Sequence, residues 1–154
     1  FGETDMRHFE DIVVGEKNRF GQYLVTREEV LDFAAKYDPQ PFHLSDEAAA
    51  QTHFGRLAAS GWHSCAMCMA MMVEQFAAAG HAGLGSPGID ELRFIKPVYP
   101  GDVLHVEAEV LEKTRSKSKP EMGSYRSRIE LVNQDGVVVV RFTAIDLIRA
   151  RSTQ

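Results

Sequence analysis

An aspartate and a histidine, Asp38 and His43, stand five residues apart in a stretch that also holds Pro39 and Pro41. A carboxylate and an imidazole are side chains that enzymes commonly use as general acids and bases. Each proline fixes its own φ and pushes the preceding residue toward extended geometry, so the two side chains can converge with little residual freedom. Preorganisation of this kind favours positioned proton transfer. Asp38 and His43 are therefore a candidate catalytic pair.

The same stretch also fits a plain turn. Asp-Pro is a common turn pair, and His43 would then simply precede a helix cap at Ser45. From these residues alone, the catalytic and the turn interpretations both stay open.

Cys65 and Cys68 form a C-x-x-C pair, but they lie within a run of alanine and methionine that is typical of a buried helix. A redox role would need a thioredoxin-like context. We interpret the two cysteines as small buried hydrophobes of a protein in a reducing compartment. The remaining histidines lack metal-ligand spacing, so we expect no metal site. These are His8, His53, His63, His81 and His105.

Two short helices are expected around the candidate pair. Thr26 and Glu29 fit a capping box, and apolar residues follow at near-helical spacing to about Lys36, before the prolines forbid continuation. Ser45 is the expected cap of a second helix that ends near Gly55.

A third and longer helix is expected over residues 63–79, closed near Gly80. The segment from Cys65 to Val73 leaves no polar face in its first half. A helix that is apolar all round is buried on nearly all sides, so another part of the chain must wrap it.

The second half of the chain is predicted to supply antiparallel strands. Apolar and polar residues alternate there, and Asp135-Gly136 is a hairpin signal. A polar and mobile loop is expected over residues 113–123. The expected strands cover residues 92–95, 104–110, 125–131 and 137–148.

The composition describes one globular domain. The chain has 154 residues, 44% of them hydrophobic and 25% charged, which allows a sizeable core. A net charge of −5 argues against nucleic-acid binding. The longest apolar run is too short to span a bilayer and no signal peptide is visible, so we expect a cytoplasmic protein that binds no membrane. Residues 1–5 precede a methionine, and we interpret them as a leader or an expression remnant.

The stretch Asp38-Pro39-Gln40-Pro41-Phe42-His43 resembles the Asp-x-Asn-Pro-x-His motif of MaoC-like dehydratases and (R)-specific enoyl-CoA hydratases, with Gln40 in place of the usual asparagine. The resemblance covers nearly the whole chain. It implies the α+β hot-dog fold, a curled antiparallel sheet wrapped around a long apolar central helix, as a single domain over residues 1–154. The other matching stretches are Phe9 to Glu16, Phe54 to Arg56, Ala59 to Gly61 and Arg93 to Asp102.

The resemblance implies a hydratase/dehydratase that adds water to a 2-enoyl-CoA thioester. Asp38 and His43 would hold the water, one acting as base while the other delivers a proton to C2. Charge that develops on the thioester oxygen needs preorganised donors, and the N–H of Gly61 at a helix N-terminus is suitable. The alternative for Gly61 is a plain helix-entry glycine.

Substrate contacts are expected from Gln40, Ser60 and Met67, although a methionine cluster on an apolar helix is also typical of plain core. Coenzyme A is expected only as part of the substrate, with no other cofactor. Candidates for its phosphates are Arg56, Arg93 and Lys96, each of which also fits a solvated surface charge. The accessory serine that some hydratases of the family carry on the helix has no counterpart in residues 66–69, which leaves that role in doubt.

An exposed edge strand invites pairing, and the resemblance implies a homodimer or a dimer of dimers. Two other functions remain alternatives. A hot-dog thioesterase generally uses a carboxylate on or near the central helix, where the first acidic residue here is Glu74, well past its start. A non-catalytic acyl-thioester binding subunit would not need the intact Asp38 and His43.

Overall fold

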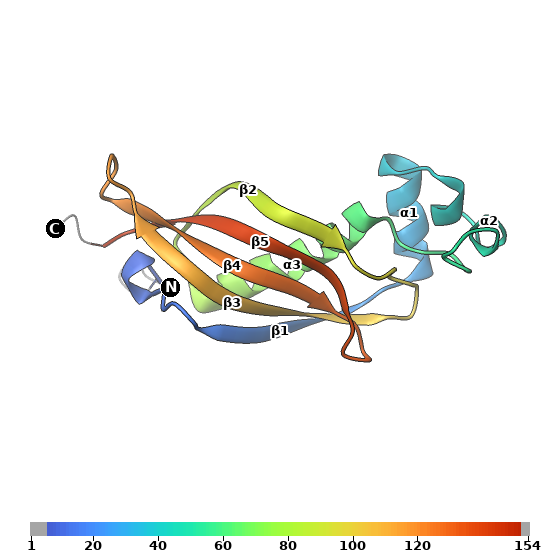
Figure 1. Cartoon of the computed structure of the whole chain (residues 1–154), viewed down its shortest axis with the longest axis horizontal. Coiled ribbons are helices and arrows are strands. Elements are labelled where there is room, and N and C mark those ends of the chain that lie inside the picture. Colours follow the sequence, from blue (N-terminus) through green and yellow to red (C-terminus); the bar gives the residue numbers. More distant parts are fainter. Residues whose placement is uncertain (1–5, 152–154) are drawn as a thin grey trace.

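A five-stranded antiparallel sheet, ordered β1-β3-β4-β5-β2, lies along helix α3 in the computed structural model, which describes residues 6–151 (Figure 1). The predicted α+β hot-dog fold is confirmed. The helices are α1 (Arg27–Tyr37), α2 (Asp46–Ala50) and α3 (Gly61–Ala79), with 3-10 turns at Phe9–Asp11 and Pro41–His43. The strands are β1 (Lys17–Leu24), β2 (Gly83–Phe94), β3 (Val103–Arg115), β4 (Met122–Val132) and β5 (Val138–Arg149). The interpretation of residues 1–5 falls outside the described residues.

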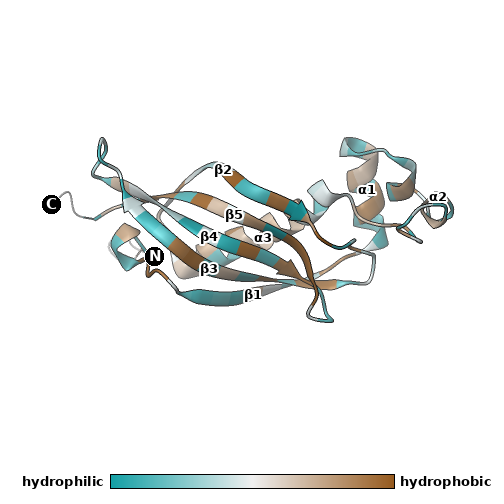
Figure 2. Cartoon of the chain, viewed as in Figure 1, coloured by the Kyte–Doolittle hydropathy of each residue, from teal (hydrophilic) through white to brown (hydrophobic). Residues whose placement is uncertain are grey.

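The central strands bury one face against α3. Val106 lies opposite Leu131 on the β3–β4 ladder, and Ile129 lies opposite Phe142 on the β4–β5 ladder; all four are buried. Hydrophobic and hydrophilic segments alternate along these strands in Figure 2. This confirms the alternation expected from the sequence, and it fixes α3 to the sheet through non-polar contact.

The outer strands differ from the sequence predictions. No strand was predicted over β1, and β2 begins at Gly83 rather than at residue 92. Every β2 residue except Leu92 is exposed, so this edge strand is held by its backbone ladder to β5 and leaves no burial pattern in the sequence. The predicted loop over residues 113–123 is wrong at its ends, because the β3–β4 ladder continues to the pair Arg115 and Gly123.

The helix caps largely match the sequence prediction. The Thr26 hydroxyl accepts the N–H of Glu29 at 3.2 Å, but the Glu29 carboxylate accepts from the Tyr23 hydroxyl at 2.8 Å instead of completing a capping box. Ser45 caps α2, which ends at Ala50 and not near Gly55. Gly80 closes α3 with a φ of 66°, the left-handed geometry that suits glycine.

Helix α3 is buried on one side only, so the prediction of burial on nearly all sides is wrong for the single chain. Met67 and Met71 face the core, whereas Trp62, Met69 and Val73 are 61%, 49% and 54% exposed. A five-stranded sheet curls over one face of the helix and leaves this apolar stripe uncovered. Within residues 6–151, no helix is long and apolar enough to cross a membrane.

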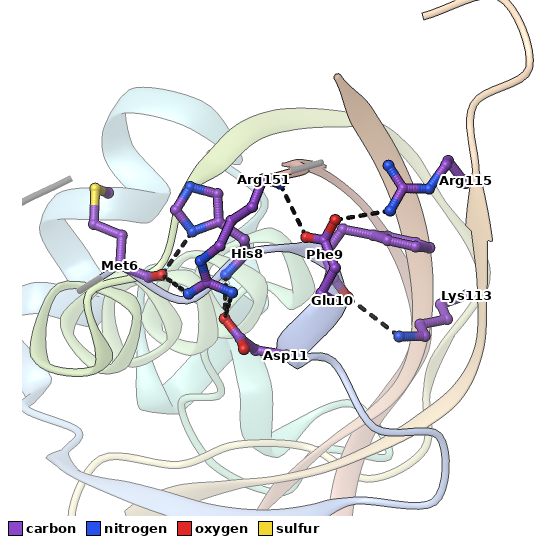
Figure 3. A network of polar contacts seen from close by, with 8 residues as sticks. All are labelled: Met6, His8, Phe9, Glu10, Asp11, Lys113, Arg115 and Arg151. Carbon is purple, nitrogen blue, oxygen red and sulfur yellow. Dashed lines mark hydrogen bonds and ion pairs between the residues drawn. The ribbon is translucent and has the colours of Figure 1, made fainter. Parts of the chain in front are cut away.

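Both ends of the described chain are tied together by a polar network (Figure 3). Arg151 pairs with Asp11 at 2.6 Å and donates its backbone N–H to Glu10 at 3.0 Å. Arg115, at the end of β3, reaches Glu10 at 2.7 Å and lies over the Phe9 ring. The segment 9–11 is thereby fixed to the loop end of the β3–β4 hairpin.

A small cavity of about 60 Å³ lies between the second half of α3 and the sheet. Asp146, His81 and Tyr125 line it, and the Tyr125 hydroxyl is 3.2 Å from His81 Nε2. Burial raises the pKa of Asp146 to about 6, and burial together with the charge of Arg7 lowers the pKa of His81 to about 4. Asp146 is therefore neutral only below about pH 6, whereas His81 is neutral above about pH 4.

Replacing Asp146 with asparagine is expected to stabilise the protein above pH 6. The raised pKa means that the folded state binds the Asp146 proton more tightly than the unfolded state does. The penalty of ionising it grows from about pH 4 to pH 6 and then stays constant, reaching at most about 3 kcal/mol. Urea unfolding should therefore show a gain for Asp146→Asn at pH 8 and little change at pH 4. Asp135→Asn, in an exposed turn, is the control; an Asp146→Asn effect equal at both pH values would contradict the assignment.

Candidate active site

The end of α1 and the turn that follows it position the candidate pair. The Asp38 N–H makes the last helical bond, to the Ala34 carbonyl at 2.9 Å, and Pro39 and Pro41 prevent another turn. A 3-10 turn over Pro41–His43 then brings His43 back into the interior. The prolines thus help to bring Asp38 and His43, which are five residues apart in the sequence, close together in space.

The Asp38 carboxylate is held by three side chains. Gln40 Nε2 donates to Oδ1 at 2.6 Å, Ser60 Oγ donates to Oδ2 at 2.7 Å, and His43 Nε2 lies 3.5 Å from Oδ2. Burial acts to raise the pKa of Asp38, but the two hydrogen bonds and the charge of His43 outweigh it and hold that pKa below its ordinary value. Asp38 is therefore ionised at neutral pH and can accept a proton.

His43 is buried and fixed by the backbone. Its Nδ1 lies 2.7 Å from the carbonyl oxygen of Ala58. A carbonyl only accepts hydrogen bonds, so Nδ1 carries the hydrogen of this contact. Nε2, directed toward Asp38, is the nitrogen that remains able to exchange a proton.

A pocket of about 470 Å³ opens beside the pair. Its walls include the apolar side chains Ala59, Ile95, Val98 and Val140, and His53 and Lys96 also line it. An apolar wall with a few polar groups gathered at one place is the usual form of a small-molecule site.

Two aromatic rings form part of the pocket lining at its exposed side. Trp62 and Phe94 stand edge to face with ring centroids 6.0 Å apart, and both are more than half exposed. Neither was singled out from the sequence, where an aromatic residue beside a helix start carries no distinctive signal. The Ala58 carbonyl was also missed, because a backbone acceptor leaves no trace in residue type.

Gly61 lies where α3 begins and also lines the pocket. A Cβ at this position would lie 2.6 Å from the Phe94 ring, so a larger residue would require that ring to move. As a first-turn residue, its N–H has no acceptor within the helix. The geometry is compatible with the predicted oxyanion donor, which stays a prediction.

The structure gathers Asp38, His43, Gln40 and Gly61 around one pocket. Ser60 is fully buried and lies behind Asp38, off the pocket lining. The predicted substrate roles of Ser60 and Met67 are untested.

Met67 packs in the hydrophobic core and does not line the pocket. Among the three predicted phosphate ligands, Lys96 lines the pocket, whereas the Arg56 guanidinium stacks 4.0 Å over the Tyr99 ring. Arg93 donates to the carbonyl of its neighbour Leu92 and does not line the pocket.

Comparison with known proteins gives one consistent family. The MaoC like domain family matches residues 11–131. A MaoC-like dehydratase from Rhodospirillum rubrum has a TM-score of 0.86 and 40% identity over 95% of this chain and 99% of its own. An R-hydratase from Pseudomonas aeruginosa has a TM-score of 0.68 and 30% identity over 94% and 86% of the two chains. A 3-hydroxybutyryl-CoA dehydratase from Methylorubrum extorquens is 27% identical over 140 residues, covering 90% of this chain and 86% of that protein.

Adding a methyl group at position 61 is expected to destabilise the protein and disturb the pocket. Gly61→Ala forces the Phe94 ring aside, and because that ring is half exposed and can move, the loss should lie near the lower end of the about 1–3 kcal/mol typical of overpacking. Thermal unfolding measures the loss. Phe94→Leu in the Gly61→Ala background should recover part of it by making room. Equal losses in the single and double variants would show that the Phe94 contact is not the cause.

Proposed function

Because this chain belongs to the MaoC-like domain family, we propose that it adds water reversibly across the double bond of a 2-enoyl-CoA thioester to give a 3-hydroxyacyl-CoA. One observation carries the proposal: an ionised carboxylate lies 3.5 Å from an imidazole of fixed orientation, beside a partly apolar pocket. Such a pair can activate a water molecule as a nucleophile, because one group takes a proton from the water while the other holds the water in place.

Asp38 is the base of the proposed reaction. In the hydration direction it takes a proton from a water held between Oδ2 and His43 Nε2, as the water oxygen forms a bond to C3. The pair starts in its ion-pair form, so the Nε2 hydrogen of His43 goes to C2. A proton transfer from Asp38 to His43 across their 3.5 Å separation then restores the starting state. Water enters, and no other reactant is consumed.

The N–H of Gly61 is the proposed donor to the thioester oxygen. Negative charge develops on that oxygen while C3 is attacked, and the N-terminal end of α3 presents unpaired N–H groups with a favourable dipole. The pocket lining brings Gly61 and the acid–base pair to the same space. Lys96 and His53 on the pocket wall are available for the polar part of coenzyme A, which is present only as the carrier of the acyl group.

The two alternatives fit the site less well. A thioesterase carboxylate on the central helix has no counterpart in the pocket, since Glu74 lies exposed in the second half of α3. A binding subunit has no need of a carboxylate held by three partners. With crotonyl-CoA and longer enoyl-CoAs, loss of the enoyl-thioester absorbance without release of free thiol would identify hydration, whereas loss accompanied by free thiol would identify hydrolysis.

A second copy of the chain is the proposed cover of the apolar stripe on α3. Trp62, Met69 and Val73 are exposed on that helix, and the neighbouring edge strand β2 has a free backbone edge. Pairing two β2 edges would extend the sheet and bring a second α3 alongside the first. Both cysteines are free thiols, which supports a cytoplasmic location.

Asp38→Asn and His43→Ala are each expected to lower kcat by roughly 10²–10⁴-fold, the usual effect of a positioned acid or base. The double variant should be little worse than the poorer single one, because both groups act on one water. Circular dichroism and thermal unfolding should show folded proteins. Near-normal turnover by folded Asp38→Asn protein would rule out the mechanism.

Light scattering at micromolar concentration is expected to give a dimer mass, twice 17.2 kDa, or a multiple of it. Val73→Glu places a charge in the apolar stripe and should shift the protein toward monomer. Ser118→Glu, in the exposed hairpin loop, adds the same charge away from the stripe and is the matched control. A monomeric wild-type protein would refute the proposed assembly.

A further inference from the structure

Ser60 occupies the junction between the acid–base pair and the central helix. It is the N-cap of α3, its side chain has 0% exposure, and it does not line the pocket. A hydroxyl in that position has no direct route to a substrate in the pocket. Its contacts are with the protein, and one of them is the proposed base.

The two hydrogen bonds of the Ser60 hydroxyl have a fixed direction. Its Oγ lies 2.7 Å from Asp38 Oδ2 and 3.3 Å from the backbone nitrogen of Trp62. An ionised carboxylate has no hydrogen to give, and an amide N–H cannot accept. The hydroxyl therefore accepts from Trp62 and donates to Asp38, so the two bonds polarise each other.

A capping role alone would not require a hydroxyl. Asparagine and aspartate cap helices as well as serine does, because capping needs only an acceptor for the first-turn amides. Position 60 must also supply a donor to a carboxylate 2.7 Å away, where an aspartate would repel Asp38. This second requirement points beyond helix stability.

We infer that Ser60 is a positioning residue for the base: it links the N-terminus of α3 to Asp38 Oδ2 and holds the carboxylate ionised and aligned with His43. The role replaces the substrate contact expected from the sequence, and it rests on the proposed function. Gln40 holds the other oxygen, Oδ1, so Ser60 specifically controls the oxygen that faces His43.

The charged groups around Asp38 stay the same when Ser60 is changed. His43 faces Asp38 at 3.5 Å from the 3-10 turn, and His53 and Lys96 line the same pocket. Replacing Ser60 by an uncharged residue alters none of them. A change in the titration of Asp38 would therefore report the lost hydroxyl.

Ser60→Ala is the direct test, with kcat, KM and the pH profile of kcat/KM measured on an enoyl-CoA. We expect kcat to fall about tenfold or more, with a smaller change in KM. The acid limb, which is the fall of kcat/KM at low pH as Asp38 is protonated, should move up by about one pH unit, as for a lost hydrogen bond to a charged group. Ser60→Thr keeps the hydroxyl and should restore both. Ser60→Gly removes the hydroxyl with little loss of capping, so it should show the same changes in kcat and in the acid limb. It takes the place of Ser60→Ala in the test if that variant folds poorly.

Thr26→Ala is the matched control, since it removes the N-cap hydroxyl of α1 far from the pocket. It should lower the melting temperature without moving the acid limb. If Ser60→Ala and Ser60→Gly behave in the same way, Ser60 is only a cap and the inference fails. A raised KM with an unmoved acid limb would instead mean that Ser60 contacts the substrate, which also overturns it.

Carboxyl ¹³C NMR of Asp38 gives a readout that needs no turnover. The titration midpoint should be higher in Ser60→Ala than in wild type, and Ser60→Thr should return it. An unchanged midpoint overturns the positioning role whatever the activity. The proposed function would be refuted if the wild-type protein hydrated no enoyl-CoA. If the Asp38 midpoint were still higher in Ser60→Ala than in wild type, the link between Ser60 and Asp38 would stand.

Discussion

The hold on the Asp38 carboxylate is the interaction on which the remaining geometry depends. Three segments meet at it: α1, whose C-cap is Asp38 itself, the proline turn through His43, and α3 through its N-cap Ser60. A partly buried ion is tolerated only when donors replace its lost water. The sheet contributes indirectly: it packs against the inner face of α3 and so fixes the position of the helix N-terminus, where Ser60 lies.

Asp38 and Asp146 show how neighbouring groups decide the state of a carboxylate. Burial acts on both, but at Asp38 the donors Gln40 and Ser60 outweigh it, whereas at Asp146 burial is the cause that acts and raises the pKa to about 6. One end of the helix–sheet sandwich therefore favours the ionised form of its carboxyl, and the other end favours the protonated form up to about pH 6. The ionised form is thus favoured at Asp38, where the proposed reaction needs a proton acceptor. The burial of each carboxyl lowers the stability of the protein to some extent.

The sequence predicted what depends on local rules. Caps and apolar spacing located α1, α2 and α3, and the proline-stiffened motif located Asp38 and His43. It located only the end of β2 and could not reveal residues 83–91, because an edge strand held by backbone pairing to β5 has no burial pattern. The Ala58 carbonyl and the Trp62–Phe94 pair were missed for a related reason, because contacts between residues distant in the sequence bring Ala58 to His43 and Phe94 to Trp62.

The polar network around Arg151 has a consequence for how the domain can be joined to others. It brings segments near both ends of the described chain together, at the opposite end of the molecule from α1 and α2 (Figure 1). Polypeptide attached at either side would extend away from the pocket. The same adjacency should allow a circularly permuted form of the described residues, with Met6 and Arg151 joined by a short linker and new ends opened in the exposed hairpin loop at residues 116–121.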